Sequence, residues 1–118
     1  MLLLPSSVIA HELTPSYPIF SQSYIDSIYV TDLRLFNRRE EINYYEIQVY
    51  DEEWNPLPFA AINNLLKIEY LETVTFSLYI HEKNIDRVTY ICTESKLPKG
   101  YKELTAVSSR ICSRVKRE

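Results

Sequence analysis

The chain has 118 residues, which is enough for one domain with its own core but not for two. Hydrophobic residues make up 46% and charged residues 25%, as in ordinary globular proteins, and a net charge of -3 excludes nucleic-acid binding driven by overall positive charge. Ten tyrosines and a single glycine favour an all-β chain whose turns are longer loops rather than tight glycine hairpins.

Residues 1–24 contain three prolines and no helical period, so we expect an extended N-terminal arm before a β-sandwich domain at residues 25–118. The arm starts with Leu2, Leu3 and Leu4, and it lacks the basic leader and the length of a signal peptide or a membrane span. We therefore predict synthesis in a cytoplasm with reduced thiols. The three leucines are expected to dock on their own domain or on another subunit, and deleting residues 1–22 is expected to leave the domain folded.

Six later segments alternate between apolar and polar residues over strand-like lengths: residues 27–36, 42–50, 65–70, 73–80, 87–93 and 105–115. Residues 73–80 show the clearest alternation, with the side chains from Val74 to Ile80 at even positions forming one apolar face. Such a face needs a second sheet across it. The sequence therefore predicts an antiparallel β-sandwich of about seven strands, and its only helix candidate is a turn at residues 60–64.

Asp86, Tyr90 and Cys92 are spaced as in the late strand of immunoglobulin-like domains, which this segment resembles. The resemblance implies an immunoglobulin-like sandwich, with the Tyr90 hydroxyl bonded back to the chain. If segments 87–93 and 105–115 are neighbours, Cys92 and Cys112 share one sheet and do not form the usual bridge between sheets.

Residues 33–37, 47–51 and 55–58 also look like the amino-terminal domain of pilus-assembly chaperones, a variant of the same sandwich. A secreted chaperone is expected to have a signal peptide and a second domain, and we expect neither here. Small single-domain sandwiches without secretion signals are similar to accessory proteins of bacteriophage particles, and this step is an analogy between folds.

Catalytic and metal-binding patterns are weak throughout the chain. His11 and His81 have no sequence neighbours that suggest a triad or a metal pair, so we expect both to be solvated. An acidic loop offers clustered oxygen ligands of the kind that calcium prefers, but it lacks the spacing and glycine of known calcium loops; its oxygen-bearing residues are Asp51, Glu52, Glu53 and Asn55. Both cysteines fall in alternating strands, and one glycine cannot build a phosphate loop. We therefore predict no enzyme activity, no metal and no cofactor.

Charge and aromatic residues suggest an interface instead. Residues 40–53 carry six acids and no base, whereas residues 99–118 carry six bases and two acids. Tyrosine and tryptophan side chains on a strand face are typical of protein interfaces. The predicted interface residues are Leu2, Leu3, Leu4, Tyr44, Tyr50, Trp54, Tyr79, Arg114, Lys116 and Arg117.

These features predict a non-enzymatic structural subunit of a larger assembly, a bacteriophage virion protein that decorates the capsid or associates with the tail. Its expected partners are protein subunits of capsid, portal or tail, with no membrane and no nucleic acid. The alternative is a binding module that recognises a peptide strand or a carbohydrate at a sheet edge or at the loops near Trp54 and Tyr101. An enzyme would gain support only if His81, Glu82 and a cysteine shared a pocket.

Overall fold

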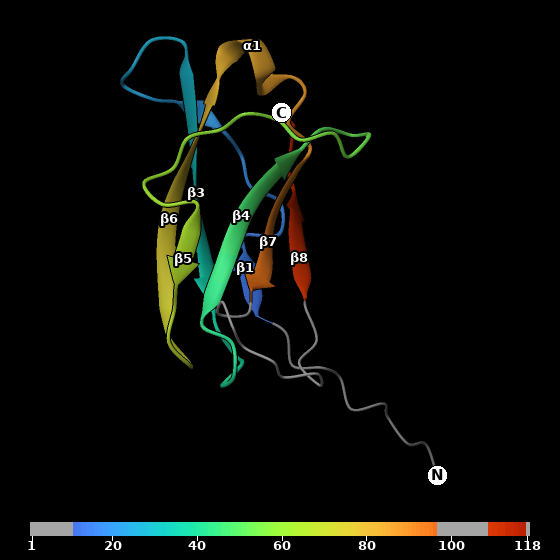
Figure 1. Cartoon of the computed structure of the whole chain (residues 1–118). Coiled ribbons are helices and arrows are strands. Elements are labelled where there is room, and N and C mark those ends of the chain that lie inside the picture. Colours follow the sequence, from blue (N-terminus) through green and yellow to red (C-terminus); the bar gives the residue numbers. More distant parts are fainter. Residues whose placement is uncertain (1–10, 97–108, 118) are drawn as a thin grey trace.

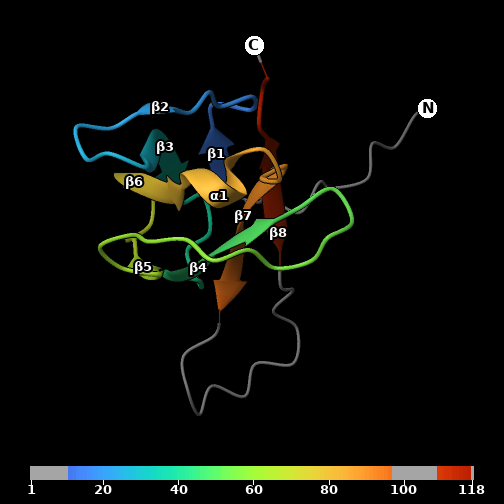
Figure 2. The same cartoon turned by 90° about the horizontal axis from the view of Figure 1, so that it is seen from above.

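The structure is a computed structural model that describes residues 11–96 and 109–117. The described residues form two antiparallel four-stranded sheets that pack face to face (Figures 1 and 2). Sheet A contains β1 (Glu12–Thr14), β2 (Ser21–Gln22), β3 (Ile28–Phe36) and β6 (Thr73–His81). Sheet B contains β4 (Tyr44–Tyr50), β5 (Leu65–Lys67), β7 (Tyr90–Lys96) and β8 (Arg110–Arg114). The predicted all-β sandwich is confirmed.

The core lies between the sheets and follows the alternation of the strands. Leu33 and Leu35 of β3 and Leu78 and Ile80 of β6 are almost fully buried, and the intervening side chains point outward. On the facing sheet, β4 contributes buried side chains at every second position, as predicted for Tyr45, Ile47 and Val49. A period of two therefore sets which residues form the core.

Sheet A is closed on one side by two short strands that pair with the same edge of β3. β1 pairs opposite Arg34 to Phe36, and β2 pairs opposite Tyr29 and Val30. Residues 12–14 and 21–22 thus belong to the sheet, although they lie within the segment predicted to be an arm. Residues 1–10, which include Leu2, Leu3 and Leu4, lie outside the described residues, and the arm boundary at residue 24 stays a prediction.

The chain between β1 and β2 crosses from sheet A to sheet B. The carbonyls of Ser16 and Pro18 accept hydrogen bonds from the backbone N–H groups of Arg114 and Lys116, at 2.9 and 2.8 Å. The Ser113 hydroxyl donates to the Pro15 carbonyl at 2.8 Å. One N-terminal segment therefore bonds both sheets and covers the side of the sandwich between β3 and β8.

The helix expectation was wrong. Residues 60–64 form no helix; Ala60 instead exchanges two backbone hydrogen bonds with Tyr79, beside β6. The short helix is α1 (Glu82–Ile85), where only a turn was expected after β6, and the His81 side chain caps its start by accepting from the Lys83 N–H. Here the cap after β6 decided the conformation, because it satisfies one of the free N–H groups of the first helical turn.

The two cysteines form a disulfide between adjacent strands of sheet B. Cys92 of β7 pairs directly opposite Cys112 of β8, with 4.0 Å between their Cα atoms. The prediction that both lie in one sheet is confirmed. The expectation of reduced thiols was wrong, because two cysteines at one register position on neighbouring strands are close enough to bond.

Candidate functional site

The most distinctive group of side chains lies on the outer face of sheet B, where β4, β7 and β8 run side by side (Figure 1). It consists of Tyr50, Trp54, Tyr90, Arg110 and Arg114, which we call the aromatic–arginine cluster. Tyr50 ends β4 opposite Tyr90 of β7, and Tyr90 in turn lies opposite Arg114 of β8. Register alone thus places three of the five residues in one row.

Trp54 joins this row because the loop after β4 folds back on itself. The Asp51 carboxylate accepts from the backbone N–H groups of Glu53 and Asn55 at 2.9 and 2.8 Å, and Trp54 adopts a positive φ of 66°. The hydrogen bond from the Asn55 backbone N–H is the main cause that holds the pKa of Asp51 below its usual value. These two hydrogen bonds to Asp51 close the loop and place Trp54 over sheet B.

The aromatic rings of the cluster are closely packed but still reach solvent. Trp54 stacks on Tyr90 with 3.9 Å between ring centroids and an angle of 4° between planes, and Tyr50 lies at 5.6 Å from Trp54 with a tilt of 55°. Trp54 nevertheless remains 44% exposed. A rigid, partly exposed indole is suited to packing against another molecule, because little side-chain freedom is lost on binding.

Two arginines lie at the ends of the stacked pair. The Arg110 guanidinium is 5.5 Å from the Trp54 ring centroid, and that of Arg114 is 5.5 Å from Tyr90, whose hydroxyl accepts from Arg114 at 3.0 Å. Within the described residues, neither guanidinium forms an ion pair with an aspartate or glutamate. Both charges are held in place by aromatic faces and can still bind a carboxylate.

The acidic residues of this sheet face pair elsewhere. Lys96 of β7 lies 2.7 Å from a Glu94 oxygen and 3.5 Å from a Glu46 oxygen, and the hydrogen bond that it donates to Glu94 is the main cause of its raised pKa. Arg87 approaches Asp51 at 3.7 Å. In the described structure, the acids of residues 40–53 therefore do not form ion pairs with Arg110 or Arg114, although the charge asymmetry of the sequence allowed such pairs.

The structure brings together three of the predicted interface residues and places Tyr44 and Tyr79 away from them. Tyr50, Trp54 and Arg114 meet in the cluster, whereas Tyr44 lies half-buried at the opposite end of β4 and Tyr79 lies on sheet A. Tyr90 and Arg110 were missed as site residues. Their positions could have been inferred from the sequence, since each lies two residues from a cysteine that shares their strand face.

The C-terminal basic residues have different roles. Lys116 is exposed and its backbone N–H bonds Pro18. Arg117 donates to the carbonyls of Ile85 and Asp86 at 2.7 and 3.0 Å, and also to that of Val88. Arg117 thus ties the C-terminal end to the last residue of α1 and to the chain that follows it, and its role at an interface stays a prediction.

Two further expectations for single residues were wrong. The Tyr90 hydroxyl accepts from Arg114 on the sheet surface, and among the described residues it makes no hydrogen bond to a backbone group, because Tyr90 faces away from the core. His11 is only 2% exposed; its Nε2 donates to the Thr93 carbonyl at 3.1 Å, and its ring lies 4.5 Å from that of Tyr45. Burial, the largest cause, lowers the pKa of His11 to about 4.

Other chemistries find little support in the described part of the chain. No three side chains of His, Cys, Asp or Glu gather there as a potential metal site. His81 lies at the end of β6, whereas both cysteines lie in the disulfide on sheet B, so these residues share no pocket in the described structure. Among residues 11–96 and 109–117, no helix has the length and apolar character needed to cross a membrane.

Two known structures share the fold of this chain, although its sequence matches no known family. No family model matches the chain, and no curated protein does. The structure of the E. coli chaperone DraB is similar to it, with a TM-score of 0.64 and 13% identity over 90% of this chain and 53% of that one. The periplasmic chaperone SfaE gives a TM-score of 0.57 and 14% identity over 90% and 56% of the two chains.

The chain thus spans a little over half the length of either chaperone. The sandwich is immunoglobulin-like and of the pilus-chaperone kind, which confirms that resemblance at the level of fold. The similarity to bacteriophage accessory proteins stays a prediction.

Proposed function

We propose that this chain is a non-enzymatic, protein-binding β-sandwich whose contact surface is the aromatic–arginine cluster. One observation carries the proposal: the exposed Trp54 indole stacks on Tyr90, and an arginine lies at each end of this pair. Neither arginine has a carboxylate partner among the described residues. Tryptophan, tyrosine and arginine are the residues that dominate binding energy at protein interfaces.

The charges of the cluster indicate the chemical character of the partner. Arg110 and Arg114 would bind carboxylates, and the Trp54–Tyr90 stack would pack against an apolar or aromatic side chain lying between them. The expected partner is therefore a protein segment with acidic residues on both sides of an apolar one. A carbohydrate is a weaker match, because Tyr90 already covers one face of the indole.

Two settings are compatible with this surface. A role as a binding module is consistent with the fold shared with two chaperones. A role as a bacteriophage virion subunit, with capsid, portal or tail partners, rests on an analogy between folds. A virion subunit would copurify with particles at fixed copy number, and a binding module would be a monomer with a soluble ligand. Measuring mass and copy number in purified samples distinguishes the two.

The disulfide bears on where the chain works. Disulfides persist in oxidising compartments and are rare in a reducing cytoplasm, and one of the two similar chaperones is described as periplasmic. We therefore propose that the chain functions in an oxidising compartment, in place of the cytoplasmic location expected from the sequence.

The surface can be tested by site-specific photocrosslinking in the cells that make the protein. A photoreactive phenylalanine at position 54 should give a crosslinked product with a protein partner, and the same residue at position 24 should give none. Tyr24 is a suitable control because it is 94% exposed and lies outside the cluster. Replacing both arginines, Arg110→Glu and Arg114→Glu, should abolish the product. Equal crosslinking from both positions, or a product that survives the double substitution, contradicts the proposal.

A further inference from the structure

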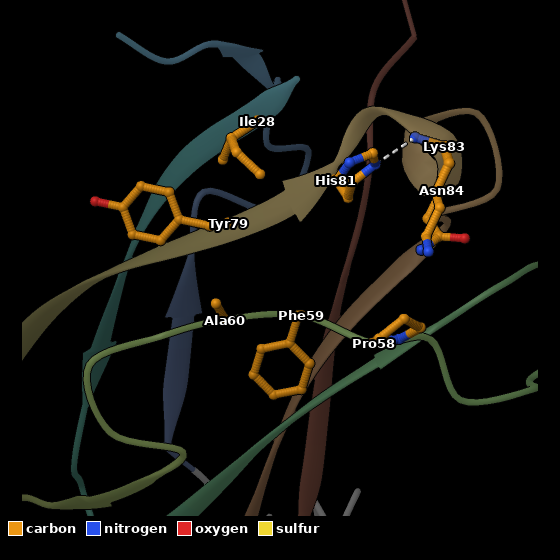
Figure 3. Close-up of a pocket in the computed structure, with 8 residues that line it drawn as sticks. All are labelled: Ile28, Pro58, Phe59, Ala60, Tyr79, His81, Lys83 and Asn84. Carbon is orange, nitrogen blue, oxygen red and sulfur yellow. Dashed lines mark hydrogen bonds between the residues drawn. The ribbon is translucent and has the colours of Figure 1, made fainter. Parts of the chain in front are cut away.

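A pocket of about 290 Å³ lies on the other sheet, where the end of β6 turns into α1 (Figure 3). Its lining residues are Ile28, Pro58, Phe59, Ala60, Tyr79, His81, Lys83 and Asn84. They come from β3, from the segment that runs beside β6, from β6 itself and from α1. The pocket is separate from the aromatic–arginine cluster, and the inference drawn from it does not depend on the function proposed above.

The walls of the pocket are mostly apolar and are held in place by the backbone. The Ala60 N–H donates to the Tyr79 carbonyl at 3.0 Å, and the Tyr79 N–H donates to the Ala60 carbonyl at 2.9 Å. This pair of bonds fixes Pro58 and Phe59 beside β6. Its volume is just below the roughly 300–1,000 Å³ of typical small-molecule sites, so the pocket is suited to one large side chain rather than to a cofactor.

Asn84 is the unusual residue of the pocket. It is only 6% exposed, and its side-chain amide has no hydrogen-bond partner among the described residues. Its backbone carbonyl is already used, because it accepts from Arg87 and Val88. No described side-chain nitrogen or oxygen is both fully buried and unpaired, so the amide must keep contact with the open space of the pocket. Figure 3 shows this side chain extending from α1 toward Pro58.

The hydrogen-bonding capacity of this amide narrows the class of ligand. A carboxamide both donates and accepts, as does a peptide group, whereas a carboxylate only accepts. His81 adds a second donor at the rim: since Nδ1 accepts from the Lys83 N–H at 3.1 Å, the ring proton lies on Nε2. The Asn84 amide and the His81 Nε2–H beside mostly apolar walls match a peptide backbone that carries an apolar side chain.

We infer that this pocket binds a polypeptide segment of another protein, taking up one leucine-sized or phenylalanine-sized side chain while the Asn84 amide hydrogen-bonds the backbone next to it. The bond would satisfy a nearly buried polar group that otherwise has no partner in the described structure, which favours the bound state. Phe59 and Tyr79 supply the apolar contacts, and Asn84 supplies the orientation.

The test uses small probes that contain only the recognised groups. N-acetyl-leucine N-methylamide and its phenylalanine analogue are titrated into the ¹⁵N-labelled full chain, with the Asn84 side-chain NH₂ resonances as the readout. Both should shift these resonances saturably, and the serine analogue should not. 4-Methylpentanoate tests the carboxylate alternative: if it binds more tightly than the leucine probe, a peptide is the wrong ligand class.

Two substitutions separate binding from folding. Asn84→Leu should weaken the leucine probe about tenfold, the effect of one lost hydrogen bond, without lowering the melting temperature, because it removes a polar group that has no partner in the free protein. Ala60→Trp should block the pocket, whereas Asn63→Trp, outside it, should bind the probe normally. Unchanged binding in Ala60→Trp, or no shift of the Asn84 signals with either apolar probe, overturns the inference.

Discussion

His11 connects the N-terminal segment to the middle of sheet B. Because the Thr93 carbonyl can only accept, Nε2 of His11 carries the proton, and Nδ1 accepts from the Ser109 hydroxyl at 3.3 Å. The ring is therefore held neutral inside the sandwich. Arg39, whose side chain is 5% exposed, adds a repulsive charge that disfavours protonation further.

This arrangement predicts a loss of stability in mild acid. With a pKa of about 4 when folded and 6.5 when unfolded, His11 stabilises the fold above pH 6.5, and this stabilisation is lost as the pH falls toward 4. Between pH 6.5 and pH 5 the free energy of unfolding should fall by roughly 1.5 kcal/mol from this residue alone. Urea denaturation at both pH values measures the change.

A His11→Gln variant provides the reference, since glutamine cannot titrate and His81 is present in both proteins. Its free energy of unfolding should change less between the two pH values than that of the unaltered chain. A parallel loss in both proteins would mean that other groups cause the acid sensitivity.

The roles of single residues were predicted less well from the sequence than the strands were. Nothing next to His11 in the sequence indicates burial, because its partners Thr93 and Ser109 are more than 80 positions away. Arg117 lies in a basic C-terminal stretch typical of a surface tail, yet it donates hydrogen bonds to three backbone carbonyls at the end of α1 and just beyond it. Trp54 stays a predicted interface residue, and its stacking on Tyr90 depends on a loop closed by Asp51, which the sequence does not reveal.

Among the elements, β8 depends most on a covalent bond. It is five residues long and pairs with β7 on one side, and the Cys92–Cys112 disulfide joins the two strands at the middle of their register. Arg110 and Arg114 lie on either side of Cys112. The disulfide therefore holds the cationic half of the aromatic–arginine cluster against its aromatic half.

Removing this bond should lower the free energy of unfolding by about 3 kcal/mol, the loop-closure effect expected for a separation of 20 residues. The double variant Cys92→Ala and Cys112→Ala, compared with the oxidised chain by chemical denaturation, gives this difference. A reducing agent should destabilise the unaltered chain by a similar amount and should not affect the double variant. If the double variant is as stable as the oxidised chain, β8 is held by its hydrogen bonds alone.

The strands were predicted well, because the alternation of apolar and polar residues is a local property of the sequence. The ends of the strands were predicted less well, because they depend on pairing with strands that are distant in the sequence. β3 and β6 begin and end within one residue of the predicted segments, and the buried positions agree. The predicted strand at residues 87–93 is displaced, since β7 runs from Tyr90 to Lys96 opposite β4. β5 stops at Lys67, where its pairing with β4 ends, although the alternation continues to Tyr70.

For the whole molecule, the segment from His11 to Pro18 decides which truncations can fold. It contributes Leu13 to the core and the β1 pairing to sheet A, and its Ser16 and Pro18 carbonyls bond sheet B. We therefore no longer expect the domain to stay folded when residues 1–22 are deleted. That deletion removes β1, β2, a buried leucine and His11 together.

Deleting residues 1–10 should preserve a cooperative thermal transition, whereas deleting residues 1–22 should cost on the order of 5 kcal/mol, comparable to the stability of a whole domain. Near-ultraviolet circular dichroism during heating distinguishes the two outcomes. The shorter deletion also removes Leu2, Leu3 and Leu4 while it keeps β1 and β2, so that any loss of partner binding cannot be attributed to unfolding. A cooperative transition in the longer deletion at the original temperature would show that the segment is dispensable.

The anchoring of Arg117 to the carbonyl of Ile85 brings the C-terminal end of the described chain next to the helix that carries Asn84 (Figure 1). A test sequence fused beyond this point through a short flexible linker would be tethered near the pocket at a millimolar effective concentration. Weak ligands would then occupy it without being added in excess, and libraries of such fusions could be ranked by how strongly each one raises the melting temperature.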